Sequence, residues 1–284
     1  MGNPVFGRAD VFQPRHPQQS ANHGSQAGGW GTSQQPYLQG QGMAGAAALG
    51  QPGNLDQPRQ ATMTLDDVIA KTGVVLLVLA AAAALTFSFV GTNLATAGTI
   101  TVVTSLVSFV TVLIVSARRR VPAGGVMAYA LVEGVFIGAF SAVFEARYPG
   151  IVVQAALGTF AAAGVTLAVY KFTGFRVTSR FRRIVTIATF GFAGAMLLNL
   201  ILALCGINLG IRDSGGAVSG IAIIASIVGV VLAASSLIMD FDSVRVGIDN
   251  HAPTSESWRA AFGIAVTMVW LYTEILRILS YFRE

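Results

Sequence analysis

Cysteine, charge and histidine are all scarce in this sequence, and each shortage excludes a class of protein. The 284 residues include one cysteine, which excludes an intrachain disulfide and a metal cluster held by cysteines. Charged residues make up 11% of the chain, against about 25% in soluble domains, and none stands between residues 72 and 117. This composition is typical of a membrane protein.

The histidines lie too far from the apolar runs to serve a membrane-embedded hydrolase. His16, His23 and His251 all fall outside those runs, and neither His-Glu-x-x-His nor Gly-x-Ser-x-Gly occurs, which excludes histidine-dependent metalloproteases and serine esterases. An aspartyl intramembrane protease needs carboxylates on two neighbouring helices. Beside Asp242, however, the last apolar run has Glu274 and no glycine-flanked aspartate. We therefore expect no enzyme and no cofactor.

Long apolar runs are what the sequence has in abundance. They cover residues 72–90, 94–115, 122–144, 151–170, 184–204, 217–239 and 260–282. Each approaches the ~20 residues that a helix needs to cross hydrocarbon, and in lipid the backbone must satisfy its own hydrogen bonds. Residues 61–284 are thus predicted to form an all-α integral membrane bundle of seven helices. Thr64, three residues before Asp67, indicates the N-cap of a lead-in to the first helix.

Residues 1–60 have a different composition from the rest of the chain. They hold eleven of the twelve Gln, six of the nine Pro and eleven of the 32 Gly. A segment of this kind buries too little apolar surface to offset the entropy lost on ordering. We expect a disordered cytoplasmic tail that is dispensable for folding and insertion. A docking segment is the alternative.

The basic residues predict how the chain is oriented. If the seven runs alternate in direction, fourteen of the eighteen Lys and Arg fall on one side and three on the other, while Arg277 lies within the last run. Positively charged loops remain in the cytoplasm. We expect a multi-pass protein of the cell membrane with a cytoplasmic N-terminus and an external C-terminus. The basic stretch at 171–183 follows the same rule, so we expect a lipid bilayer and no nucleic acid as partner, and leave protein partners open.

Charged side chains within the apolar runs are few and therefore informative. Glu133 stands in the middle of the third run, Glu274 and Arg277 in the seventh, and Asp240 and Asp242 just after the sixth. A charge at the bilayer centre costs about 2.5–3.5 kcal/mol on insertion scales unless it is paired, neutral or hydrated. These acids indicate a function that involves protons or cations.

Two of the acids also have a purely structural interpretation. Glu274 and Arg277 are three residues apart on one helix, so they can form an ion pair that only orients that helix. Glu133 can be a protonated carboxyl that forms a hydrogen bond with a neighbouring helix, with Asn199 as the candidate partner. The sequence does not decide between these interpretations and a functional one.

The two aspartates after the sixth run are two residues apart and so point to different faces of a helix. One of them can look into the bundle while the other meets water. Acids on neighbouring helices that share a proton can act as a pH sensor, because two like charges cannot both ionise freely. For Asp242 and Glu274 we favour such a sensor over a protease.

Three short motifs follow one another on the third, sixth and seventh runs. Residues 130–138 read Ala-Leu-Val-Glu-Gly-Val-Phe-Ile-Gly, residues 241–243 read Phe-Asp-Ser, and residues 271–276 read Leu-Tyr-Thr-Glu-Ile-Leu. They resemble the Glu-Gly, aromatic-Asp-Thr/Ser and Leu-Tyr-x-Asp segments of the Bax inhibitor-1 (YccA-like) family. The resemblance covers roughly residues 60–284.

The resemblance implies a bundle whose last helix is enclosed by the other six, and a pH-sensitive leak of calcium or other cations. It implies that the acids on helices six and seven, here Asp242 and Glu274, share a proton and control opening. In the family a basic residue near the end of helix two latches the helix-six acid. Arg118 to Arg120 are the candidates here, with Asp240 as a further accessory residue. Glu274 departs from the family's Asp, and Arg277 one turn later can hold it ionised.

Two main hypotheses follow. In the first, the protein is a cation (calcium) leak gated between roughly pH 5 and 8, in which protonation holds Asp242 and Glu274 together and ionisation separates them. In the alternative, it is a membrane partner that modulates proteolysis or a stress response without transport, and the acids are structural. A proton-coupled carrier is a third, less favoured reading. If the two carboxyls lie more than about 8 Å apart and Arg277 forms an ion pair with Glu274, the shared-proton hypothesis is wrong. Whether a metal ion binds is left open.

Overall fold

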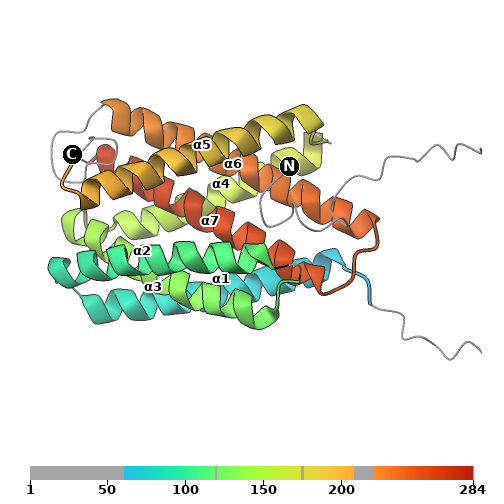
Figure 1. The fold of residues 1–284 in the computed structure, drawn as a ribbon, viewed down its shortest axis with the longest axis horizontal. Coiled ribbons are helices and arrows are strands. Elements are labelled where there is room, and N and C mark those ends of the chain that lie inside the picture. Colours follow the sequence, from blue (N-terminus) through green and yellow to red (C-terminus); the bar gives the residue numbers. More distant parts are fainter. Residues whose placement is uncertain (1–60, 92, 119, 174–175, 208–219, 284) are drawn as a thin grey trace, which may run out of the picture. The chain divides into compact units, whose positions relative to one another are not determined.

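The computed structural model describes residues 61–91, 93–118, 120–173, 176–207 and 220–283 (Figure 1). Within these residues it contains seven helices: α1 (Leu65–Val90), α2 (Leu94–Ala117), α3 (Ala123–Arg147), α4 (Ile151–Thr173), α5 (Ser179–Leu204), α6 (Gly220–Asp249) and α7 (Glu256–Tyr281). Each is long and apolar enough to cross a membrane, which confirms the predicted all-α membrane fold. The expected disordered tail, residues 1–60, lies outside the described residues.

Several helices extend beyond the apolar runs that predicted them. The Thr64 hydroxyl accepts a hydrogen bond from the Asp67 amide at 3.2 Å, so α1 begins seven residues before its apolar run, as the capping pattern predicted. At the other end of the chain α6 continues ten residues past its run, to Asp249. Both extensions consist of turns that carry polar side chains, which hydropathy alone does not count as membrane helix.

Helices α1 and α3 pack against each other through two glycines of α3. A Cβ atom added at Gly134 would lie 2.5 Å from the Leu79 carbonyl oxygen and 2.6 Å from the Ala82 Cβ. Gly138, one turn later, meets the next turn of α1 in the same way. The missing side chains let the two backbones touch, which is how small residues join helices in a membrane.

The last helix has the most extensive buried surface. It packs against α6, α1, α4 and α3, and its inner residues Ala261, Phe262 and Leu271 are fully buried. Enclosure of α7 by all six other helices stays a prediction. Helix α5 is the opposite case, because it packs mainly on α6 and buries only Val185 and Thr186.

Large apolar side chains cover the outward faces of the bundle. Leu85 is 73% exposed and Phe89 is 91% exposed, and similar side chains project from α2, α4 and α5. A soluble protein rarely exposes apolar surface on this scale. The outward faces are therefore suited to contact with lipid chains.

The residues just before α1 are fastened to the connection between α6 and α7. The Met63 amide donates to the Ala252 carbonyl at 2.7 Å, and the Thr254 amide donates to the Ala61 carbonyl at 2.9 Å. The Met63 side chain is buried in the main core. Lys71 reinforces the contact by donating to the Thr254 carbonyl at 3.1 Å. Residues 61–64 are thus part of the folded unit.

This contact predicts different outcomes for two truncations. Removing residues 1–60 should leave the melting temperature of the purified protein unchanged. Removing residues 1–64 should lower it by about 5 °C, because burial of one Met side chain contributes about 1.5–3 kcal/mol and each kcal/mol is worth about 2–4 °C in a chain of this size. Thermal unfolding followed by intrinsic fluorescence measures both. Equal stability of the two truncated proteins would show that the contact at residues 61–64 contributes nothing.

Candidate functional site

Glu133 lies on the inner face of α3 and is buried within the span. Its Oε2 accepts a hydrogen bond from the Ser108 hydroxyl of α2. Tyr129, one turn earlier on α3, is also buried and packs edge-on against Phe262 of α7, with ring centroids 4.9 Å apart. A hydrogen bond from Glu133 to a neighbouring helix was expected, but its partner is Ser108 of α2 and not Asn199 of α5.

Glu274 is the second acid in the interior, and its side chain is 1% exposed. Arg277 Nη1 donates to its Oε2 at 3.4 Å and Trp270 Nε1 donates to its Oε1 at 3.3 Å, so the predicted ion pair is present. The carboxyl group rests against Gly229 of α6, where an added Cβ would lie 2.7 Å from Glu274 Cδ. Gly229 therefore provides the space that the carboxyl occupies.

Both acids line one cavity of about 450 Å³ between α2, α3, α5 and α7, which we call the carboxylate cavity. Glu133 enters it from α3 and Glu274 from α7, and Arg277 lines it as well. Five hydroxyl-bearing residues add to its polar lining: Ser105, Ser108, Tyr129, Thr189 and Thr273. Aromatic side chains form much of the remaining lining. Among them are Phe192 and Trp270, whose ring centroids lie 5.8 Å apart.

The charges of the carboxylate cavity do not balance. Its lining residues carry two carboxyls and one guanidinium, and the guanidinium of Arg277 contacts Glu274. When both acids are ionised, the charge of Glu133 is in excess. A cavity with excess charge of one sign concentrates counter-ions, so it can hold a proton or a cation. Sequence reasoning had identified Glu133 as a separate feature and had not joined it to Glu274.

The expected contact between Asp242 and Glu274 is not formed, and that prediction is wrong. Glu274 lies at the level of Gly229 on α6, whereas Asp242 stands thirteen residues further along the same continuous helix. At 1.5 Å per residue, the two positions differ in depth by about 20 Å. A shared proton needs a separation of a few ångströms. The ion-pair interpretation of Glu274 with Arg277 takes its place.

Asp242 pairs instead with Arg182, in the first turn of α5. Arg182 Nη2 donates to Asp242 Oδ2 at 2.8 Å, and each side chain is 12% exposed. The Tyr170 hydroxyl of α4 reaches Oδ1 of the same carboxylate at 3.5 Å. This ion pair joins α5 to α6 at the end of α6 that leads into α7.

Asp240 and Asp242 point to different faces of α6, as predicted, but neither meets water freely. Asp240 is fully buried and accepts a hydrogen bond of 2.6 Å from the Thr267 hydroxyl of α7. Asp242 is the outer of the two and is covered by Arg182. At Arg118 the backbone carbonyl accepts a hydrogen bond of 3.3 Å from Arg259. A latching role for the Arg118 side chain stays a prediction.

Three residues of the site escaped the sequence reasoning. Ser108 is one of many hydroxyls in the apolar runs, and Arg182 belongs to a basic stretch that topology alone explained. Gly229 contributes no chemical group and acts only by leaving space. The position of Arg182 just before an apolar run was a signal that it shared with Arg180 and Arg183, so the sequence could not single it out.

In the part of the chain that the structure describes, no group of three or more His, Cys, Asp or Glu is placed to hold a metal ion.

Comparison with known proteins places the chain in a family. No curated protein matches the sequence. A family model described as Bax inhibitor 1 like matches residues 3–284. With seven apolar helices and this match, the chain belongs to the Bax inhibitor 1 like family of membrane proteins.

Proposed function

We propose that this protein lets cations, calcium among them, leak across the membrane through the carboxylate cavity. The observation that carries the proposal is the convergence of Glu133 and Glu274, from two helices, on one cavity within the span. Carboxylate oxygens are preferred ligands of calcium. Weak binding at a few such groups lets an ion enter and leave. None of these residues is assigned a catalytic role.

In this proposal Glu133 makes the leak depend on pH. Arg277 already balances Glu274, so the excess negative charge of the cavity belongs to Glu133. Protonation of Glu133 removes that charge, and with it the attraction for cations. The leak should therefore decrease as the pH falls. Ionisation therefore opens the leak, as the sequence-based hypothesis also expected, but the acid that ionises is Glu133 in place of the Asp242–Glu274 pair.

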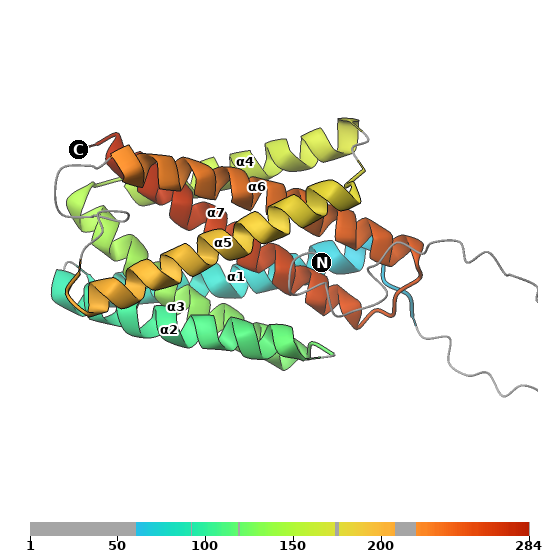
Figure 2. The ribbon, with the colours of Figure 1, turned by 45° about the horizontal axis from the view of Figure 1, so that its top comes forward.

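Helix α5 acts as the cover of the cavity in this proposal. Figure 2 shows α5 passing in front of α7, and Thr189, Phe192 and Met196 of α5 line the cavity. Because α5 packs mainly on α6 and buries little of its own surface, it is the least firmly held wall. The ion pair between Arg182 and Asp242 fastens it to α6.

The proposal places the Arg182–Asp242 pair at the cytoplasmic side of the cell membrane. Its support is the concentration of fourteen of eighteen basic residues on that side of the helices. The N-terminus is then cytoplasmic and the C-terminus external. A topology reporter fused after residue 175 should be read inside the cell and one after residue 284 outside. An inside reading at both residues would mean that α7 does not cross the membrane and that the C-terminus is not external.

A second candidate function is a membrane partner that modulates proteolysis or a stress response without transport. The observation in its favour is that all four candidate acids that the sequence places in or beside the apolar runs form hydrogen bonds in the structure. Their partners are Ser108 for Glu133, Thr267 for Asp240, Arg182 for Asp242 and Arg277 for Glu274. Acids with such partners can serve packing alone.

Full-length protein in liposomes loaded with a calcium-sensitive dye tests the first proposal. Calcium should enter faster than in protein-free liposomes, and the rate should fall as the pH is lowered from about 8 to about 5. Glu133→Gln keeps the size of the side chain and removes its charge. It should reduce the rate at the higher pH about tenfold, the equivalent of 1.4 kcal/mol, and abolish the pH dependence. Arg277→Gln should raise the rate, because Glu274 then adds uncompensated charge.

Asp249→Asn is the matched control, since this carboxylate at the end of α6 is 70% exposed and lies outside the cavity. It should leave the rate and its pH dependence unchanged. A rate no higher than in protein-free liposomes at any pH would favour the second candidate. A leak that grows as the pH falls, and loses this response in Asp242→Asn but not in Glu133→Gln, would move pH sensing to the Arg182–Asp242 pair.

A further inference from the structure

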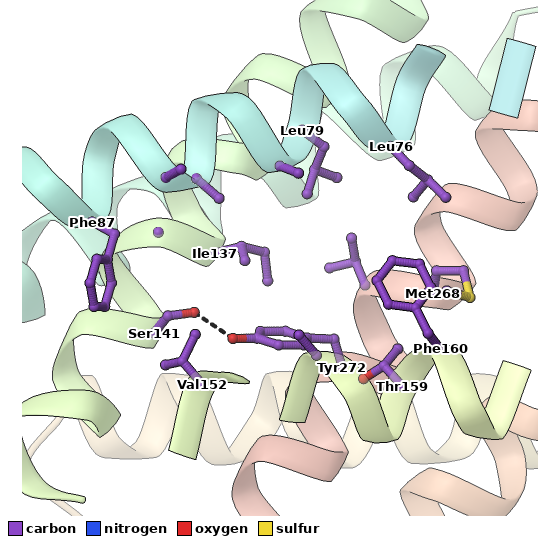
Figure 3. Close-up of a pocket in the computed structure, with 16 residues that line it drawn as sticks. Leu76, Leu79, Phe87, Ile137, Ser141, Val152, Thr159, Phe160, Met268 and Tyr272 are labelled. Carbon is purple, nitrogen blue, oxygen red and sulfur yellow. Dashed lines mark hydrogen bonds between the residues drawn. The ribbon is translucent and has the colours of Figure 1, made fainter. Parts of the chain in front are cut away.

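A second cavity, of about 370 Å³, lies between α1 and α4, with α3 and α7 behind it (Figure 3). We call it the α1/α4 window. Ala84 of α1 and Phe160 of α4 line it and are exposed, so they stand at its mouth. Ile137 of α3 and Met268 of α7 line it and are buried, so they form its floor. The volume falls within the roughly 300–1,000 Å³ of small-ligand sites.

The described residues that line the window carry only three polar side chains, and each of these already forms a hydrogen bond. The hydroxyls of Ser141 and Tyr272 form a hydrogen bond with each other at 2.7 Å, which Figure 3 shows across the cavity. The Thr159 hydroxyl donates to the Ala155 carbonyl at 2.7 Å. The remaining lining side chains are apolar. A water molecule needs two to four polar partners, and the window offers so few that it favours hydrocarbon over water.

The mouth of the window continues the lipid-facing surface of the bundle. No charged residue occurs on α1 from residue 72 to 90 or on α4 from residue 151 to 170. Leu85 and Leu157, which flank the mouth, are 73% and 67% exposed. Bilayer hydrocarbon therefore covers the opening, while Arg283, which donates to Gln154 Oε1 at 2.9 Å, supplies a positive charge at the start of α4.

The position of the window along the helices selects one leaflet. Its lining on α1 runs from Leu76 to Phe87, and all of these residues except Leu76 lie in the half of α1 that leads to its C-terminus. Its lining on α4 runs from Val152 to Phe160, in the half next to the N-terminus. Both halves lie toward the same membrane surface. A lipid acyl chain that enters from this side reaches α7 near the middle of the membrane.

We propose that the α1/α4 window binds one acyl chain of a phospholipid from the leaflet at which α1 ends and α4 begins. This acyl chain lies between α1 and α4, and its end contacts Met268 and Tyr272 of α7. The headgroup remains in the interface outside the window. This site differs from the carboxylate cavity, although Val269 of α7 lines both, and it stands whether or not the protein conducts cations.

Photo-crosslinking in liposomes tests the site on the full-length protein. The probe is a phosphatidylcholine with a diazirine in the outer half of one acyl chain, and adducts are mapped by peptide mass spectrometry. Adducts should form on Met268 and Tyr272 of α7 as well as on the lipid-facing side chains of α1 and α4. These two residues line the window and not the carboxylate cavity, so adducts on them report an acyl chain inside the window.

Two filling variants and two matched controls complete the test. Ala84→Phe and Ala156→Phe, which place a ring in the window, should lose the α7 adducts. Ala81→Phe and Ala161→Phe make the same change at exposed positions outside the window and should keep them. Adducts confined to outward side chains in the unmodified protein would overturn the proposal, as would α7 adducts that persist in both filling variants. The first of these outcomes needs no variant, so poor folding of a filling variant leaves the test intact.

Discussion

Replacing Gly138 with valine should force α1 and α3 apart and lower the melting temperature of the protein by about 10 °C. A Cβ atom at this position would lie 2.8 Å from the Thr86 Cβ and closer still to the Ala83 carbonyl oxygen. The obstruction is backbone, so no side chain can rotate to relieve it. Overpacking of this kind costs about 1–3 kcal/mol or more, and each kcal/mol corresponds to about 2–4 °C. Thermal unfolding of the purified protein measures the shift.

Other glycines of the bundle supply the matched control. An added Cβ at Gly164 of α4 or Gly194 of α5 would meet no atom within 4 Å. Gly164→Val and Gly194→Val should therefore melt close to the unmodified protein. If Gly138→Val were as stable as these two, the close approach of α1 and α3 would not contribute to the fold.

The fold was predictable because hydrocarbon imposes a simple rule on sequence. Each crossing needs about 20 apolar residues, and each such run in this chain became a helix. The predicted helix ends were less accurate. Helix α6 continues ten residues past its apolar run, since its last turns carry Asp240, Asp242 and Ser243, which are polar and still pack inside the bundle. Hydropathy counts such residues as loop, whereas tertiary contacts keep them helical.

The wrong pairing of the acids of helices six and seven has a different cause. In an antiparallel pair joined by a short turn, residues equally far from the turn lie at the same depth. Asp242 stands seven residues before the end of α6, whereas Glu274 stands eighteen residues after the start of α7. The structure accordingly places Thr267 opposite Asp240, and Glu274 opposite Gly229. Motif matching identified the acids but could not supply this register.

Most hydrogen-bonding partners of the acids could not be predicted from the sequence, for a different reason. Glu274 and Arg277 are close in sequence, so helix geometry alone predicted their contact. Arg182 and Asp242 are sixty residues apart and meet only because α5 crosses α6 at one particular place. The carboxylate cavity likewise depends on how four helices pack. Such long-range contacts have no local pattern in a single sequence.

Breaking the ion pair between Arg182 and Asp242 should raise the calcium leak about tenfold at every pH. The pair joins α5, the least buried helix, to α6. A hydrogen bond between charged groups contributes about 1.5–3 kcal/mol, and 1.4 kcal/mol changes an equilibrium tenfold. Without it, α5 should leave the carboxylate cavity more often. Asp242→Asn and Arg182→Gln each remove one charge with little change in size, and dye-loaded liposomes report the rate.

The two single variants and their double variant form a cycle that separates release of the pair from other effects. If both substitutions act by breaking one contact, the double variant should leak no faster than either single variant. Arg183→Gln removes the same charge from the neighbouring, exposed position and should leave the rate unchanged. If the increases in leak rate caused by Asp242→Asn and Arg182→Gln multiplied in the double variant, the ion pair would not be what holds α5 on α6. An unchanged rate in both would mean that α5 is not the cover, because its strongest described tie to α6 would then be irrelevant to the leak.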